Sequence, residues 1–163
     1  YLGQDAKIFE IGSGPGRDAL YMQSKGFAVE CSDATPGFVN VCQEKGLNAR
    51  MFNILTDELT NSYDMIFAGA VFLHMSQEEL QQALKKMHAH LHPQAILSFS
   101  VKKGVGHEWE CGKLGNNPRY IHYWEKPELE QFLAQHHFQT LSMEHGTTSG
   151  DWLLTIARKS QLQ

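Results

Sequence analysis

A loop with three glycines at alternate positions is the part of this sequence best suited to chemistry. Gly12, Gly14 and Gly16 follow an apolar stretch that carries Glu10, and the segment after them is helical in character. Glycine lets a backbone turn tightly and approach a ligand at points where a Cβ atom would clash. The start of the helix adds unpaired N–H groups that suit a carboxylate or a phosphate. A strand, a glycine turn and a helix in this order are typical of nucleotide-cofactor sites.

The spacing of the glycines narrows the choice of cofactor. A dinucleotide fingerprint has glycine at its first, third and sixth positions, and the sixth position counted from Gly12 is Arg17. Asp33 ends a stretch of strand character about twenty residues after the loop, where an acid suits the two hydroxyls of a ribose. Because several nucleoside cofactors share this ribose, Asp33 alone does not distinguish between them.

These residues need elements that position them, and the chain alternates between strand and helix patterns. Thr35 and Pro36 predict the cap and first turn of a helix that runs to Lys45. Ser76 and Glu79 form a capping-box pattern ahead of a helix with one apolar face. This alternation predicts an α/β fold with a mostly parallel sheet.

Three further stretches have strand character. Residues 48–52 form a short expected third strand. Residues 138–144 and 152–157 are joined by the turn at 146–150, so we expect an antiparallel hairpin at the end of the chain.

Composition limits the classes of function. The 163 residues, 42% of them hydrophobic, predict one domain over residues 1–163. A net charge of −4 argues against a general nucleic-acid binder, and no apolar run reaches the length of a membrane span. The cysteines Cys31, Cys42 and Cys111 show no paired spacing. We therefore expect reduced thiols and a cytoplasmic location.

Five segments in order resemble one family. From about Lys7 to Lys159, the sequence looks like the class I S-adenosylmethionine-dependent methyltransferases, in the form of a small, bacterial-type, single-domain member. One departure is Gln94-Ala95, which replaces a double glycine ahead of the fifth strand. The segments that carry the resemblance are the glycine motif at 10–18, the fourth strand and its loop at 63–75, the turn at 91–97, the Arg-Tyr and Tyr-Trp segment at 119–124 and the last strand at 152–159.

The resemblance implies a three-layer α/β/α Rossmann-like sandwich. Its mostly parallel seven-stranded sheet would include an antiparallel C-terminal hairpin strand. Family members usually carry one or two helices ahead of the first strand. Because this chain starts at Tyr1 and enters that strand almost at once, we expect these lid helices to be missing.

The resemblance also implies which residues hold S-adenosylmethionine. The glycine loop would hold the amino-acid end of the cofactor, Glu10 would contact its amino group through water, and Asp33 its ribose. Asn53 and Ile54 would contact the adenine. Asp18 is open to a second interpretation, since an acid there also suits the positive start of its helix. The expected cofactor residues are Glu10, Gly12, Ser13, Gly14, Gly16, Asp18, Asp33, Ala34, Asn53, Ile54, Ala70 and Leu73.

The acceptor side is expected near the fourth and fifth strand ends. His74 follows the fourth strand and is either a general base or a pocket wall that packs on the cofactor. Arg119, Tyr120 and Tyr123 lie in a long insertion after the fifth strand, where loops of such folds build substrate sites. An aromatic patch that packs the insertion onto the sheet is the alternative. No catalytic residue is assigned beyond the candidates His74 and Tyr120.

Two groups of histidines are compatible with a metal by residue type. His88, His90 and His92 lie at a helix end, and His136 and His137 are adjacent. No carboxylate or cysteine nearby completes a ligand set, so we expect solvated helix ends and no metal site.

The sequence therefore predicts methyl transfer from S-adenosylmethionine to an unidentified small-molecule acceptor. The alternatives are an NAD-dependent oxidoreductase and a cofactor-binding module without catalysis. The sequence predicts neither the acceptor nor the oligomeric state.

Overall fold

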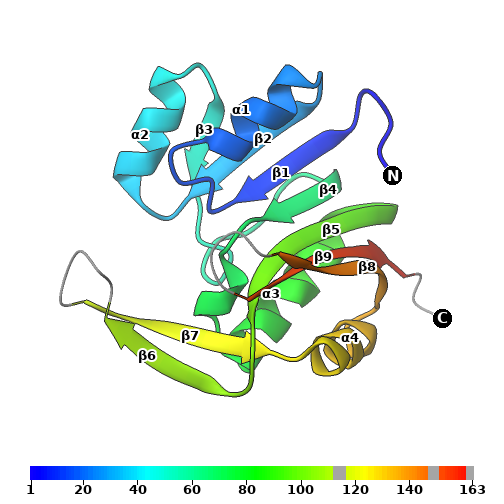
Figure 1. Ribbon diagram of the computed structural model, residues 1–163. Coiled ribbons are helices and arrows are strands. Elements are labelled where there is room, and N and C mark those ends of the chain that lie inside the picture. The colour runs from blue at the N-terminus through cyan, green and yellow to red at the C-terminus, as the bar shows by residue number, and fades with distance from the viewer. Residues whose placement is uncertain (112–116, 147–150, 161–163) are drawn as a thin grey trace.

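The computed structural model describes residues 1–111, 117–146 and 151–160, which form a mixed sheet with helices on both of its faces (Figure 1). The strands are β1 (Lys7–Ile11), β2 (Ala28–Asp33), β3 (Asn48–Met51), β4 (Tyr63–Ala68), β5 (Leu91–Lys103), β6 (His107–Cys111), β7 (Pro118–Trp124), β8 (Phe138–Gly146) and β9 (Trp152–Lys159). The helices are α1 (Arg17–Ser24), α2 (Pro36–Glu44), the 3₁₀ turn η1 (Phe72–His74), α3 (Gln77–His90) and α4 (Lys126–Gln135).

The sheet has the expected parallel half and the expected antiparallel end. Strands β3, β2, β1, β4 and β5 are neighbours in this order and run parallel. β9 then pairs antiparallel with both β5 and β8. These seven strands are the predicted Rossmann-like sheet, so the fold class is confirmed. The connection between β8 and β9, predicted as a turn over 146–150, falls largely outside the described residues.

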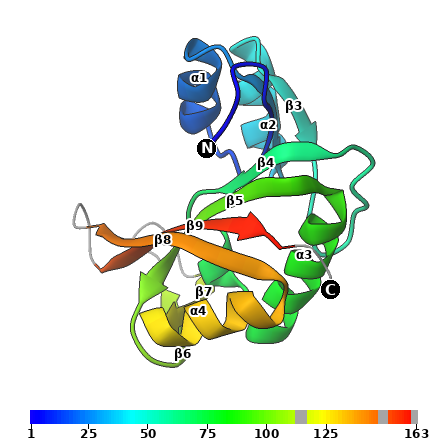
Figure 2. The same cartoon turned by 90° about the vertical axis from the view of Figure 1, so that its right-hand side faces the viewer.

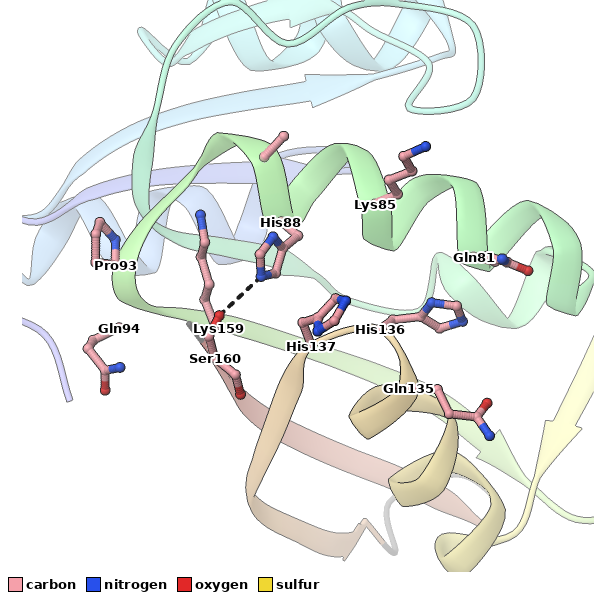
Figure 3. A pocket seen from close by; sticks show the side chains of 11 residues that line it. Gln81, Lys85, His88, Pro93, Gln94, Gln135, His136, His137, Lys159 and Ser160 are labelled. Carbon is pink, nitrogen blue, oxygen red and sulfur yellow. Dashed lines mark hydrogen bonds between the residues drawn. The ribbon is translucent and has the colours of Figure 1, made fainter. Parts of the chain in front are cut away.

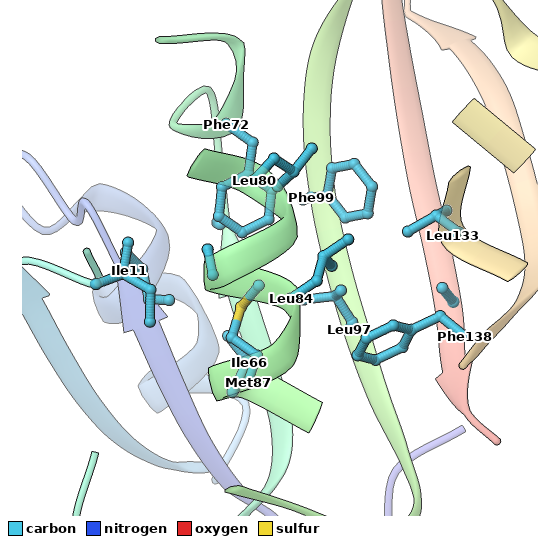
Figure 4. Packing of buried hydrophobic residues seen from close by; sticks show 14 of the residues in the cluster. Ile11, Ile66, Phe72, Leu80, Leu84, Met87, Leu97, Phe99, Leu133 and Phe138 are labelled. Carbon is cyan, nitrogen blue, oxygen red and sulfur yellow. The ribbon is translucent and has the colours of Figure 1, made fainter. Parts of the chain in front are cut away.

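Two separate apolar clusters hold the helices to the sheet. Ala19 of α1 and Val39 of α2 belong to a small cluster with Cys31 of β2. The larger cluster joins β1, β4 and β5 to the apolar faces of α3 and α4 (Figure 4). Figure 2 shows α1 and α3 on opposite sides of the sheet, which gives the three layers.

Local signals for helix ends were only partly right. Ser76 Oγ accepts from the Glu79 N–H, and Glu79 returns a bond to the Ser76 N–H, which confirms the capping box. Thr35 was expected to cap α2, but its side chain makes no capping bond. Instead, the Thr35 N–H donates to Asp33 Oδ1 at 2.8 Å, so the acid shapes this turn.

The insertion after β5 folds as a β-hairpin, which the sequence analysis did not predict. β6 and β7 pair antiparallel, with Trp109 opposite Tyr120. β7 then joins the end of β5 in parallel through Tyr123 and Trp124. In Figure 1 the hairpin projects from the body of the molecule beside α3 and α4.

Candidate functional site

The glycine loop lies at the carboxyl ends of the parallel strands, and its glycines are required by geometry. Gly12, Gly14 and Gly16 have φ angles of 70°, 51° and 81°, in the left-handed region that other residues rarely adopt. A Cβ atom at Gly12 would collide with the side chain of Val71, and one at Gly16 would lie 2.9 Å from Cys42 Sγ. A Cβ atom at Gly14 would meet no atom within 4 Å, so this part of the loop faces open space.

Asp33 fixes the shape of that loop. Its Oδ2 atom accepts from the Gly14 N–H at 2.9 Å, and its Oδ1 atom accepts from the Thr35 N–H. The Ser13 N–H donates to the carbonyl of Ser32 at 2.8 Å. Asp33 is 8% exposed, and each of its oxygens keeps a second lone pair. The carboxylate is therefore an anchor of the loop that retains acceptor capacity beside it.

Glu10 is an acidic side chain that is almost completely buried beside the glycine loop. It is 2% exposed, and its Oε2 atom is buried without a hydrogen-bond partner in the described part of the chain. Burial, followed by the nearby Asp18, raises the pKa of Glu10 to about 7, although the Ala19 N–H partly opposes this rise. A buried acceptor without a donor is costly, and a cation placed against it removes that cost. Glu10 therefore fits a ligand that carries an ammonium group.

The other expected cofactor residues surround the same strand ends. Asp18 pairs with Arg17 at 3.3 Å on the surface. Its Oδ2 would lie 3.6 Å from a Cβ atom at Gly69, so the start of α1 approaches the end of β4. Ala34 directly follows β2 and is exposed.

Ala70 lies in the loop between β4 and η1, which we call the β4 loop. Its φ angle of 57° is left-handed, which is strained for alanine. Its N–H donates to Ser100 Oγ at 2.9 Å. Backbone strain of this kind is concentrated at functional sites, which is consistent with a ligand against this loop.

The residues expected to contact the adenine differ in their exposure to solvent. Asn53 is exposed, and its Oδ1 atom already accepts from the Leu55 N–H at 3.0 Å, which leaves its amide N–H₂ to donate. Ile54 is 3% exposed and belongs to the main apolar cluster, as does Phe72 of η1. Leu73 is also buried. The side chains of Ile54 and Leu73 therefore present little surface of their own to a ligand.

His74 connects the β4 loop to the hairpin. The His74 side chain is exposed, and its Nδ1 atom lies 2.9 Å from the backbone carbonyl of Tyr120. Because a carbonyl only accepts, Nδ1 carries the proton and donates, and Nε2 is the free nitrogen. The bond sets the orientation of the ring relative to β7.

The hairpin separates the expected acceptor residues onto two faces. Arg119 and Tyr123 are on one face, where the Tyr123 hydroxyl donates to Glu108 at 2.5 Å and to Glu110 at 3.2 Å. These bonds, with the Glu108 contact first, raise the pKa of Tyr123. Tyr120 is on the opposite face. These three hairpin residues were expected to form one acceptor group with His74, but side chains alternate between the faces of a strand, so Tyr120 lies apart from the other two.

Residues that the sequence analysis missed accompany Tyr120. Its ring lies 5.4 Å from that of His107 and 5.6 Å from that of Trp109, and its hydroxyl lies 3.2 Å from His122 Nδ1. Trp109 is 66% exposed, while His122 is buried. We call His107, Trp109, Tyr120 and His122 the aromatic face of the hairpin. A period of two in ring side chains over 107–109 and 120–124 was the signal that could have revealed it.

The histidines at the end of α3 were expected to be solvated, and they are only partly so: His92 is exposed, whereas His88 and His90 are half-buried. His88 Nε2 bonds the Ser160 carbonyl at 3.2 Å, His90 Nδ1 bonds the Asn61 carbonyl at 2.9 Å, and His92 Nδ1 pairs with Asp64 at 2.9 Å. Each ring is held by a segment far away in the sequence. Over the residues that the structure describes, no three side chains of metal-ligand type converge.

Comparisons with known proteins agree with this geometry. Residues 8–94 match the methyltransferase domain family. A probable S-adenosyl-L-methionine-dependent methyltransferase TehB of Haemophilus influenzae is 27% identical over 90 residues, 52% of this chain and 32% of the relative. Phosphoethanolamine N-methyltransferase of Plasmodium falciparum is 31% identical over 103 residues, 59% of this chain and 39% of the relative. The chain spans about a third of the length of these curated relatives.

Solved structures share the fold over almost the whole chain. An S-adenosylmethionine-dependent methyltransferase from Methanosarcina mazei superposes with a TM-score of 0.86 at 19% identity, covering 99% of this chain and 96% of that one. The 1,6-didemethyltoxoflavin-N1-methyltransferase of Burkholderia thailandensis, solved with S-adenosylhomocysteine, gives 0.79 at 21% identity, with 96% and 72% covered. The NAD-dependent alternative is not favoured by these matches. With the glycine loop, the buried Glu10 and the seven-strand sheet, they show that this chain belongs to the class I S-adenosylmethionine-dependent methyltransferase family.

Proposed function

We propose that this chain transfers a methyl group from S-adenosylmethionine to a small-molecule acceptor by in-line displacement. The observation that carries the proposal is the partnerless Glu10 oxygen beneath a loop whose Gly14 faces open space. When bound, S-adenosylmethionine supplies a methyl group on a positively charged sulfur. The protein's own contribution is to bind, align and exclude water.

In this proposal the strand ends divide the cofactor between them. Glu10 receives the amino group, the glycine loop with Ser13 contacts the amino-acid end, and Asp33 with Ala34 receives the ribose. Asn53 donates through its amide to the adenine, while Ile54 and Leu73 support the pocket from the core. Ala70 and Asp18 border the amino-acid and methyl end.

The acceptor lies, in the same proposal, between the β4 loop and the hairpin. His74 carries a free Nε2 there and is the candidate base, and Tyr120 is the candidate donor. Burial, followed by the acids Glu78 and Glu79, raises the pKa of Tyr120, so its phenol is neutral near pH 7. Arg119 and Tyr123, on the other hairpin face, would contact an acceptor only from its rim.

A small acceptor is supported by two relatives. Phosphoethanolamine and 1,6-didemethyltoxoflavin are the small molecules in the names of the Plasmodium and Burkholderia enzymes. No helix among the described residues has both the length and the apolar character to span a membrane. The three cysteines are free thiols, which supports a reducing, cytoplasmic location. In this proposal residues 1–163 form one domain.

A turnover screen tests the proposal. Purified chain and S-adenosylmethionine are incubated with pooled small amines, phenols and N-heterocycles, and S-adenosylhomocysteine formation is measured. We expect one pool to give S-adenosylhomocysteine at a rate that falls at least about 100-fold in His74→Ala if His74 is the base. Cofactor binding without turnover in every pool would instead support a binding module.

A further inference from the structure

A cavity lies at the end of the molecule opposite the glycine loop. It has a volume of about 720 Å³ and forms where α3 and α4 end and β9 finishes beside the start of β5. This is within the range of small-molecule sites in proteins. Because the cofactor residues lie at the carboxyl ends of β1 to β4, this cavity is separate from the proposed methyl-transfer site.

Positive and protonatable side chains from three elements line this cavity (Figure 3). α3 contributes Lys85 and His88, the turn after α4 contributes His136 and His137, and the end of β9 contributes Lys159. The remaining lining residues in the described chain are neutral, and none is acidic.

The acids of the neighbouring elements are engaged elsewhere. Asp64, on β4, pairs with His92 and accepts from the Lys7 N–H at 2.9 Å. Glu128, in the first turn of α4, accepts from Gln77 at 3.0 Å, at the end of the helix far from this cavity. Lys159 Nζ donates to the Leu91 carbonyl at 2.6 Å, and no carboxylate of the described residues lines the cavity.

The histidine chemistry fits an anion. His88 donates from Nε2 to the Ser160 carbonyl, which leaves Nδ1 to take up a proton. Its ring lies 5.7 Å from that of His137. Burial, with a smaller effect of Lys159 and His137, lowers the pKa of His88, and burial followed by His137 lowers the pKa of His136. An anion in the cavity would oppose this lowering by its charge, so its binding would favour the protonated rings.

The backbone supplies an independent observation. Of the described non-glycine residues, only Ala70, Gln94 and His137 have a left-handed φ, and two of these three line the cavity. Gln94 and His137 have φ angles of 66° and 63°. Glycine would hold both turns with less strain. The chain instead carries hydrogen-bonding side chains there, which is typical of a site where strain serves binding.

We propose that this cavity, lined by Lys85, His88, His136, His137 and Lys159, binds a small metabolite-sized anion that bears phosphate or carboxylate groups, more tightly as the pH falls below neutrality. The pH dependence is expected because imidazole is the side-chain group that ordinarily takes up a proton just below neutrality.

The test is a titration of the full chain with inorganic pyrophosphate and, separately, with citrate, at about pH 6 and about pH 8 and constant ionic strength. We expect saturable binding near pH 6 that weakens at least about fivefold near pH 8. Tighter pyrophosphate binding assigns a phosphate ligand, and tighter citrate binding a carboxylate ligand. The absence of saturable binding near pH 6 would overturn the proposal.

Matched variants separate a built site from general charge. Lys85→Gln, within the cavity, should weaken the anion at least about fivefold. Lys126→Gln, at the start of α4 and outside the cavity, should change the affinity less than about twofold. Equal losses in both variants would mean an adventitious ion only.

A third variant distinguishes binding from folding. His137→Gly removes the ring and relieves the left-handed backbone, so the melting temperature should be unchanged or higher while the anion affinity falls. His137→Asn, which also tolerates this φ, should lose a part of the pH dependence and keep the part that His88 and His136 contribute. Wild-type anion affinity in both His137 variants would contradict the proposed role of this ring.

Discussion

At the residue scale, Glu10 combines deep burial with an oxygen that has no partner in the described chain. Its pKa is raised from 4.5 to about 7, so the folded state favours the protonated acid. The contribution of Glu10 to stability is therefore fully present below pH 4.5 and is lost as the pH rises towards 7. Without ligand, the ionised group destabilises the fold at neutral pH.

The first prediction follows from this sign. Glu10→Gln removes the charge that burial penalises, and should stabilise the ligand-free protein at about pH 8 by on the order of 1–3 kcal/mol. The same change should weaken S-adenosylhomocysteine binding at least about tenfold, because the ammonium loses its counter-charge. Chemical denaturation and calorimetry measure the two effects. A variant that binds as tightly as the wild type would show that Glu10 does not contact the cofactor.

The second prediction concerns pH and uses the same residue. The ammonium favours ionised Glu10, so S-adenosylhomocysteine should bind more weakly as the pH falls from about 7.5 to about 5.5. Glu10→Gln should lose most of this dependence, which makes it the control. A pH profile that is the same in both proteins would assign the titration to another group.

The third prediction concerns Asp33, which anchors the loop and faces the proposed ribose position. Asp33→Ala removes the acceptors of the Gly14 and Thr35 N–H groups, and should cost about 2 kcal/mol of stability. Cofactor affinity should fall by on the order of 2 kcal/mol or more. Asp33→Asn keeps one acceptor and should lose less of both. If the dissociation constant of the folded Ala variant is unchanged, the ribose sits elsewhere.

The fourth prediction separates Arg119 from the cofactor. Arg119 is exposed on β7, in the antiparallel position opposite Glu110 on β6. Arg119→Ala should change S-adenosylhomocysteine affinity less than about twofold, and should raise KM for an anionic acceptor. Tyr123→Phe, on the same hairpin face, is a control for the cofactor affinity only. Loss of cofactor binding in a folded Arg119 variant would place this residue in the cofactor pocket.

At the scale of elements, α3 offers a stability test that does not involve the ligand. Ser76→Ala removes one half of the capping box and should cost about 1 kcal/mol. Ser76 is not among the residues proposed to contact the cofactor. The dissociation constant for S-adenosylhomocysteine should therefore be unchanged. Thermal or urea unfolding measures the loss, and an unaltered melting temperature would show that the cap does not limit stability.

The elements also show what the sequence could predict. The glycine loop, the strand ending at Asp33 and the Ser76 capping box are local patterns, and the structure contains all three. The hairpin of β6 and β7 was missed because β6 has only five residues and all of them are exposed, so its alternating ring side chains mark no buried face. The partners of His88, His90 and His92 lie 28 to 72 residues away, a separation that helix patterns do not reveal.

At the scale of the whole molecule, the two proposed sites lie at opposite ends of the strands of the sheet. The carboxyl ends of β1 to β4 hold the proposed methyl-transfer site, and the opposite end holds the proposed anion cavity. The proposed acceptor side depends on a cofactor bound at the carboxyl ends of β1 to β4.

Cofactor binding is tested most directly by the melting temperature of the chain with S-adenosylhomocysteine and, separately, with NAD. A ligand that binds only the native state stabilises by about 2.7 kcal/mol at a hundredfold excess over its dissociation constant. We therefore expect S-adenosylhomocysteine to raise the melting temperature by several degrees, and NAD to leave it unchanged. A shift with NAD and none with S-adenosylhomocysteine would contradict the account.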